Sequence, residues 1–227
     1  MNRIFTILFV LLTINLVSQN KVNTNLFGFR TSLAFIFFDT QDSLFLKDVH
    51  SISPNVLSFP GGFGNFYHLE GPGYGLKIKE ISKYQKNDKR NKNAVFLNNL
   101  TINQNHNENY IYDFIKLVKA TGCSVIYDAN IISSNPEEVL KIIKLLLDHD
   151  VTLLGVELGG ELYDMSYMHF MNIDKYISLA KLYSDSIRKN YKDLLISVVA
   201  APNNRGSSRL SDWNSKLSKE NFYDAII

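Results

Sequence analysis

The chain has 227 residues, of which 45% are hydrophobic and 20% charged, as is ordinary for one globular domain with a sizeable core. The formal net charge of +2 gives no electrostatic reason to expect a nucleic-acid partner. The single cysteine, Cys123, excludes an internal disulfide.

The N-terminus has the layout of a secretory signal peptide. A basic start at Arg3 is followed by an almost unbroken apolar run over residues 4–17 and a polar end at residues 18–20. The run is short for a spanning helix, which needs roughly 17–25 apolar residues, although an uncleaved membrane anchor is the alternative. We therefore expect residues 1–19 to be a signal peptide, with a secreted, periplasmic or extracellular mature protein that keeps no stable membrane anchor.

The next part of the chain predicts two strands, a short helix and a long polar region. The strands are expected at residues 31–38 and 56–59, with the helix at 45–52 between them. Residues 71–110 combine Gly-Pro-Gly, a basic run and an Asn-rich segment. This composition indicates an irregular insertion whose charged part is a solvated, mobile loop.

From Tyr110 onward, apolar residues at helical spacing alternate with short apolar strands. Helix signals are clear at two places, a C-cap glycine at Gly122 and a proline, Pro136, followed by two acids in the first turn. The predicted elements are a helix ending near Gly122, a strand at 124–129, a helix from Pro136, a strand at 151–157, a helix at 173–191, and strands at 194–201 and 223–227.

This alternation predicts parallel βα units. An open doubly wound sheet is one alternative, but no GxGxxG follows the first strand, which weakens a nucleotide-binding interpretation. A (β/α)8 barrel of the TIM type fits better, although such a barrel needs eight units and about 250 residues. The chain stops inside its sixth predicted strand, so we expect residues 20–227 to be the N-terminal portion of a larger, here incomplete, barrel.

The stretch at residues 151–164 carries the main functional signal. A buried strand runs into Gly159 and Gly160, and Glu161 follows at once. Barrel enzymes place catalytic carboxylates at the carboxyl ends of their strands. The alternative is an exposed glutamate that merely opens the next loop or helix.

Four landmarks together resemble the retaining βα-barrel glycosidases related to α-L-arabinofuranosidases and heparanase-like glucuronidases. They are Val56-Leu-Ser-Phe-Pro-Gly-Gly62, Tyr67-His68, Glu157-Leu-Gly-Gly-Glu161-Leu-Tyr163 and Tyr223-Asp-Ala-Ile-Ile227, in the order and at the spacing of that group. The resemblance implies that Glu161 is the acid/base of a retaining mechanism, which pairs two carboxyl groups roughly 5–5.5 Å apart. In that group the nucleophile is a glutamate at the end of strand seven, which this chain lacks.

Two positions depart from the group's pattern. Gly160 stands where the group has an asparagine that hydrogen-bonds the sugar, and Ser58 stands where it has an arginine. The serine removes a fixed positive charge that would orient carboxylates on the barrel floor, so we expect that cation to be missing.

Several other residues are candidates for contacts with a sugar. The substrate-binding residues we expect are Gly61, Gly62, Tyr67, His68, Asn130 and Tyr163. Asp128 and Asn130 end the third predicted strand, where ordinary turn chemistry is the alternative, and Glu157 is more readily a structural hydrogen-bond partner than a nucleophile. The histidines show no metal-ligand spacing and the glycine-rich turn lacks a phosphate-loop lysine, so we predict neither metal nor cofactor.

The sequence thus favours a glycoside hydrolase acting on a poly- or oligosaccharide, present as a portion without its nucleophile strand. The alternative is a non-catalytic carbohydrate-binding protein or a degenerate barrel remnant. Fold alone does not choose between them.

Overall fold

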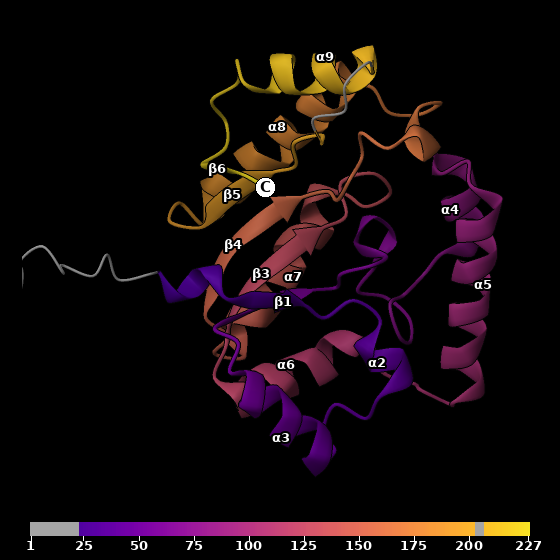
Figure 1. Cartoon of the computed structure of the whole chain (residues 1–227), viewed down its shortest axis with the longest axis vertical. Coiled ribbons are helices and arrows are strands. Elements are labelled where there is room, and N and C mark those ends of the chain that lie inside the picture. The colour runs from indigo at the N-terminus through magenta and orange to yellow at the C-terminus, as the bar shows by residue number, and fades with distance from the viewer. Residues whose placement is uncertain (1–22, 203–206) are drawn as a thin grey trace, which may run out of the picture.

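The computed structural model describes residues 23–202 and 207–227 (Figure 1). The predicted signal peptide at 1–19 lies outside the described residues. The strands are β1 (Gly28–Arg30), β2 (Val56–Phe59), β3 (Ser124–Ala129), β4 (Leu153–Leu158), β5 (Leu195–Val198) and β6 (Ala225–Ile226). The α-helices are α2 (Ala34–Phe37), α3 (Ser43–Ile52), α4 (Ile78–Tyr84), α5 (Asp88–Asn103), α6 (Tyr110–Thr121), α7 (Pro136–Asp148), α8 (Ile173–Asn190) and α9 (Ser208–Leu217).

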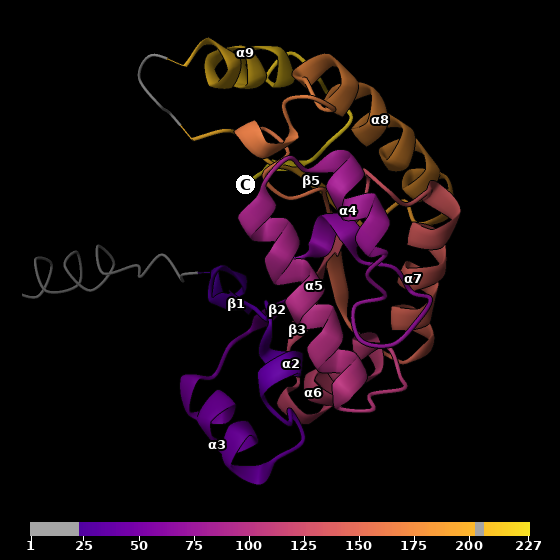
Figure 2. The same ribbon diagram turned by 90° about the vertical axis from the view of Figure 1, so that its right-hand side faces the viewer.

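The six strands form one parallel sheet in the order β1-β2-β3-β4-β5-β6. The sheet is curled, and α6, α7 and α8 follow its outer side in an arc (Figures 1 and 2). The predicted fold class, an incomplete α/β barrel, is confirmed. All carboxyl ends meet at one rim because every strand runs in the same direction, and that rim is where barrel enzymes build their sites.

The outer helices form where their capping signals predicted them. Asn109 caps α6, which ends at Gly122 in the left-handed conformation (φ 71°). Asn135 caps α7 with Pro136 in its first turn. Each helix buries one apolar face against the sheet, so the core lies between the sheet and this helical arc.

The predicted first strand at 31–38 is wrong. The strand is Gly28–Arg30, Ser32 takes a left-handed conformation (φ 48°), and a short helix follows at Ala34–Phe37. The helical turn buries Phe35 and Ile36 together while Phe37 stays exposed. Successive side chains of a strand point to opposite faces, so the burial of two consecutive residues fits a helical turn better than a half-exposed strand.

The predicted irregular insertion at 71–110 is also wrong in part, because it contains α4 and α5. Asn87 caps α5 by accepting a hydrogen bond from the backbone of Arg90. Its buried residues, Ala94, Leu97 and Thr101, recur at a spacing of three to four on an otherwise polar helix. The charged run is therefore helical and ordered rather than a loop.

No helix within residues 23–202 and 207–227 has both the length and the apolar character needed to cross a bilayer.

Candidate active site

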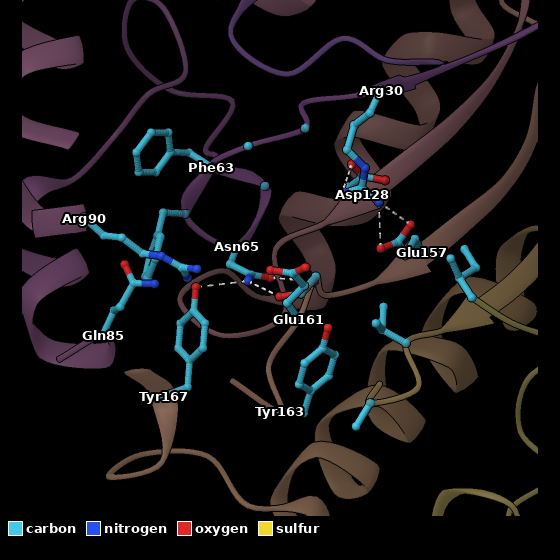
Figure 3. Close-up of a pocket in the computed structure, with 18 of the residues that line it drawn as sticks. Arg30, Phe63, Asn65, Gln85, Arg90, Asp128, Glu157, Glu161, Tyr163 and Tyr167 are labelled. Atoms are coloured by element: carbon cyan, nitrogen blue, oxygen red, sulfur yellow. Dashed lines mark hydrogen bonds and ion pairs between the residues drawn. The ribbon is translucent and has the colours of Figure 1, made fainter. Parts of the chain in front are cut away.

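The carboxyl ends of the strands open onto a cavity of about 850 Å³ (Figure 3). Each strand or the loop directly after it contributes a lining residue: Arg30, Gly61, Asp128, Glu157, Val199 and Ile227. Helix α5 and the segment before it line another side with Gln85, Arg90 and Asn93. The cavity therefore occupies the position expected of a barrel active site.

Glu161 lines this cavity and is exposed to solvent. Strand β4 ends at Leu158, and Gly159 then turns the chain with φ +75°, a conformation that side chains rarely adopt. Glu161 itself has φ +49°, which is uncommon for a residue with a side chain. Backbone strain of this kind gathers at functional sites, where the surrounding structure must hold it.

Asn65 holds the turn before Glu161. Its side-chain Oδ1 accepts from the Gly160 amide at 2.8 Å, and its Nδ2 donates to the Gly160 carbonyl at 2.5 Å. Nδ2 also donates to Tyr167 Oη at 3.2 Å. Asn65 is buried, so these bonds fix the peptide next to Glu161. Sequence reasoning missed this role, although Asn65 ends the Pro-Gly-Gly-Phe-Gly-Asn run.

Gly61 and Gly62, in the turn after β2, line the cavity, and their contact with substrate stays a prediction. A side chain on Gly61 would place its Cβ 2.5 Å from the backbone nitrogen of Ser32, and its φ is +76°. The turn therefore needs glycine to pack against the segment after β1.

The cavity floor carries a compact charged cluster made of Arg30, Asp128 and Glu157. Arg30 Nη2 lies 3.1 and 2.9 Å from the two carboxylate oxygens of Glu157, and Nη1 lies 3.3 Å from Asp128 Oδ2. Burial and the neighbouring Glu157 raise the pKa of Asp128 well above its ordinary value, against the opposing effect of Arg30. Although burial lowers the pKa of Arg30, the two carboxyl groups raise it overall. The surroundings of Asp128 therefore favour its protonated form.

The expectation that the floor lacks a cation is wrong. Arg30 is the register partner of Ser58 in the β1–β2 pair, so its side chain lies on the same face of the sheet one strand away. Arg30 on the neighbouring strand therefore supplies the guanidinium group that position 58 lacks. The ion pair of Arg30 with Glu157 joins residues 127 positions apart and depends on the sheet topology, which the local motif does not reveal.

Three of the predicted substrate-binding residues lie away from the cavity. Tyr67, His68 and Asn130 are at most 1% exposed. Tyr67 Oη donates to Asn109 Oδ1 at 2.8 Å, and Asn130 Nδ2 donates to the Tyr67 carbonyl at 3.1 Å. Their polar groups are therefore used inside the protein, and direct contact with a ligand in the cavity does not follow from this geometry.

His68 joins two helices. Its Nδ1 lies 2.9 Å from Glu138 on α7, and its Nε2 lies 3.2 Å from Glu80 on α4. Burial by itself raises the pKa of Glu138, but hydrogen bonds from His68 and Ser134 lower it to about 2. The predicted Tyr-His motif thus contributes to a structural network beside the site.

Tyr163 lines the cavity and is half-buried, with its ring edge-on to Trp213 at 6.1 Å between centroids. Trp213 is buried, and its Nε1 donates to the Val199 carbonyl at 3.0 Å. Of these two aromatic residues, Tyr163 is the one available for stacking on a sugar ring.

Among the described residues, no group of three or more histidine, cysteine, aspartate or glutamate side chains is arranged to hold a metal ion. The chemistry that the cavity offers is that of carboxyl groups, guanidinium groups and amides.

No model of a known protein family matches the sequence, and no curated protein matches it. Solved structures do match the fold. The GH51 arabinofuranosidase from Xanthomonas axonopodis pv. citri aligns with a TM-score of 0.61 at 13% identity, over 92% of this chain and 46% of that one. AbfB, a family 51 α-L-arabinofuranosidase from Bifidobacterium longum, aligns with a TM-score of 0.58 at 12% identity, over 86% of this chain and 42% of that one.

The chain therefore spans less than half the length of either enzyme. At these identities the similarity establishes the fold, a glycoside-hydrolase-like barrel whose matched neighbours process carbohydrates. It assigns no activity and no residue role to this chain.

Proposed function

We propose that this chain is the N-terminal portion of a retaining glycoside hydrolase that acts on a poly- or oligosaccharide, with Glu161 as its acid/base. The observation that carries the proposal is the position of Glu161 at the carboxyl-end rim, on the cavity and next to a peptide held by Asn65. Residues 1–19 would direct the protein out of the cytoplasm as a signal peptide.

The chemistry needs a second carboxylate on the opposite side of the sugar. The other cavity-lining carboxyl groups among the described residues are Asp128 and Glu157, and Arg30 engages both. A carboxylate held in a bidentate ion pair at the floor is poorly suited to attack an anomeric carbon. We therefore assign the nucleophile to a βα unit outside these 227 residues.

In the proposed reaction Glu161 first protonates the leaving oxygen while the nucleophile attacks the anomeric carbon. The deprotonated Glu161 then takes a proton from water, and that water releases the sugar from the nucleophile with retained configuration. The Asn65 bonds to Gly160 would keep the carboxyl group in place through both steps.

The direct test replaces Glu161 by alanine in the protein that includes the sequence encoded downstream of Ile227. Loss of general-acid help should lower kcat/KM by about 10²–10⁴-fold for substrates with poor leaving groups. Activated aryl glycosides need little protonation to depart, so their first step should lose much less. Azide should then attack the glycosyl-enzyme and give a glycosyl azide of retained configuration.

Equal losses on both substrate types with no azide product would remove Glu161 from this role. The 227-residue chain provides the matched control, because it should show no turnover without the nucleophile. Hydrolysis by that chain alone would instead place the nucleophile inside it, with Glu157 and Asp128 the first residues to replace.

The alternative function is a non-catalytic carbohydrate-binding protein or a degenerate barrel remnant, and Gly160 favours it. This glycine faces the cavity with no side chain to hydrogen-bond a sugar hydroxyl. Saccharide binding by the chain, together with a reading frame that encodes no further barrel units, would support the binding protein over the hydrolase.

A further inference from the structure

The two sides of the cavity differ in how their guanidinium groups are neutralised. Figure 3 places Glu161 between Arg30, Asp128 and Glu157 on one side and Arg90, Gln85 and Tyr167 on the other. On the first side, two carboxyl groups lie within 3.3 Å of Arg30. That cation is already satisfied by the protein and has little reason to bind an anionic ligand.

Arg209, on α9 near the same rim, is also engaged. Its Nε donates to the Tyr163 carbonyl at 2.8 Å, and Nη2 lies 3.3 Å from the Leu162 carbonyl. These bonds secure the loop after Glu161, and Arg209 does not line the cavity.

Arg90 differs from both. In the described part of the chain its guanidinium makes one ion pair, from Nη1 to Asp164 Oδ1 at 3.9 Å, and its side chain is 43% exposed. Charge-assisted N–H···O bonds usually span about 2.7–2.9 Å, so this contact leaves the guanidinium donors largely free. Asp164 Oδ1 also accepts from the Ser166 amide at 2.9 Å. Arg90 lines the cavity, and its backbone is anchored by the Asn87 cap of α5.

Other donors accompany Arg90. Tyr167 Oη accepts from Asn65 Nδ2, so its own hydrogen is free to point elsewhere. Burial raises the pKa of Tyr167 to about 12, which keeps that hydrogen in place at neutral pH. Asn93, one turn along α5 from Arg90, also lines the cavity and is exposed. This wall therefore offers a cation, a phenol and an amide.

We propose that Arg90, with Tyr167 and Asn93, forms a subsite for the anionic group of an acidic saccharide, either a uronate carboxylate or a sulfate ester. The proposal rests on the proposed function and narrows its substrate class. A guanidinium presents paired N–H donors that match the oxygens of such a group, which gives both charge and orientation. The nearby carboxylates, Glu161 and Asp164, would restrict the anion to the Arg90 side of the cavity.

Calorimetric titration of the 227-residue chain can test the subsite with tetrasaccharides of galacturonate and glucuronate. Each is compared with its methyl ester, which keeps the shape and removes the charge. A sulfated galactan tetrasaccharide distinguishes the sulfate ester from the carboxylate. We expect the free acid or the sulfate ester to bind at least tenfold more tightly than the neutral form, with the difference shrinking as salt is added.

Arg90→Gln should remove that preference. Tyr167→Phe, which keeps the aromatic ring, should reduce the preference by a few-fold. Lys92→Gln removes an exposed charge from the same helix, at a residue that does not line the cavity, and should have no effect. Arg90→Lys retains the positive charge but lacks the paired N–H donors of the guanidinium group. It should therefore keep part of the affinity for the anionic saccharide.

Tight binding of the neutral forms, with no preference for charge, would overturn the subsite and leave the proposed function standing. The subsite would also be overturned if the preference for the charged form survives in Arg90→Gln, or if Lys92→Gln lowers that preference as much as Arg90→Gln does. Failure of the chain to bind any of these saccharides would count against both proposals.

Discussion

The residue before the proposed acid/base is a glycine that has room for a side chain. A Cβ added to Gly160 would find its nearest atom, Arg30 Nη1, at 3.9 Å, which is ordinary contact. A Cβ on the neighbouring Gly159 would lie 2.8 Å from Leu162 Cδ1 on a backbone with φ +75°. The two adjacent glycines therefore have different structural requirements.

Gly160→Asn should accordingly be tolerated, with a loss below about 1 kcal/mol in the free energy of unfolding. Gly159→Ala should cost about 1–3 kcal/mol because it combines backbone strain with a steric clash. Urea unfolding of both variants provides the measurement. If Gly160→Asn binds saccharides more tightly than the wild type, the missing amide limits recognition. A loss of unfolding free energy from Gly160→Asn as large as that from Gly159→Ala would contradict the geometry.

The carboxyl pair on the cavity floor predicts an asymmetric response to neutralisation. Burial and the neighbouring Glu157 favour the protonated form of Asp128, so Asp128→Asn should change stability at pH 7 by less than about 1 kcal/mol. Glu157→Gln breaks the bidentate pair with Arg30 and should cost about 2–3 kcal/mol. Equal losses from the two variants would contradict this asymmetry.

The pH dependence has a definite sign. The pKa of Asp128 is higher in the folded than in the unfolded protein, so the folded state binds more protons between the two values. Stability should therefore fall as pH rises from about 3.9, the unfolded value, toward the raised folded value. Denaturation curves of Asp128→Asn measured over the same pH range should lack this decline.

At the scale of single residues, Glu161 was predicted near the site because the carboxyl ends of parallel strands converge. Gly61, Gly62 and Tyr163 were predicted there from the resemblance to barrel glycosidases. All four line the cavity, although their roles remain predictions. Arg30 and Asn65 were missed because each acts through a partner far away in the sequence. Such contacts follow from sheet order and loop packing, which no local pattern encodes.

At the scale of elements, periodicity predicted the outer helices well and the polar helices poorly. Helices α6, α7 and α8 carry wide apolar faces and clear capping residues. Helix α5 buries few residues, so its helical pattern is faint among the asparagines and lysines. The apolar run at 31–38 failed for another reason, since a short apolar segment fits a strand and a buried helical turn equally well.

Helix α7 also supports an ion network whose contribution depends on pH. Glu138 accepts hydrogen bonds from His68, Ser134 and the Leu69 amide, and its pKa is lowered to about 2. A lowered carboxyl pKa stabilises the folded state above the unfolded value of about 4.3. That contribution is lost as pH falls through the folded value.

Glu138→Gln should therefore lower the free energy of unfolding at pH 7 by roughly 2 kcal/mol, given that the carboxyl is partly solvated. The difference from the wild type should shrink between about pH 4.5 and pH 2, as urea unfolding across that range would show. Glu137→Gln, an exposed change in the same helical turn, is the control and should be near neutral. A constant difference at all pH values would show that the variant disturbs packing instead.

At the scale of the whole molecule, the described sheet has two outer strands. Within residues 23–202 and 207–227, β1 pairs with β2 alone and β6 with β5 alone. Phe29 and Ile226 on these strands are 46% and 50% exposed. Exposed apolar edge strands can pair with edges of other molecules, so the 227-residue chain should self-associate.

Charge on an outer strand should oppose that association. Ile226→Lys should lower the associated fraction seen by light scattering across a concentration series, because an edge lysine must be desolvated when another strand pairs beside it. Phe29→Lys tests the other edge in the same way. Leu147→Lys on α7 is the matched control, since it places the same charge at a 37%-exposed apolar position away from both edges. A wild-type chain that stays monomeric at all concentrations and unfolds in one cooperative transition would refute edge pairing. If Leu147→Lys lowers the associated fraction as much as the edge variants do, the effect is a general increase in solubility from added charge.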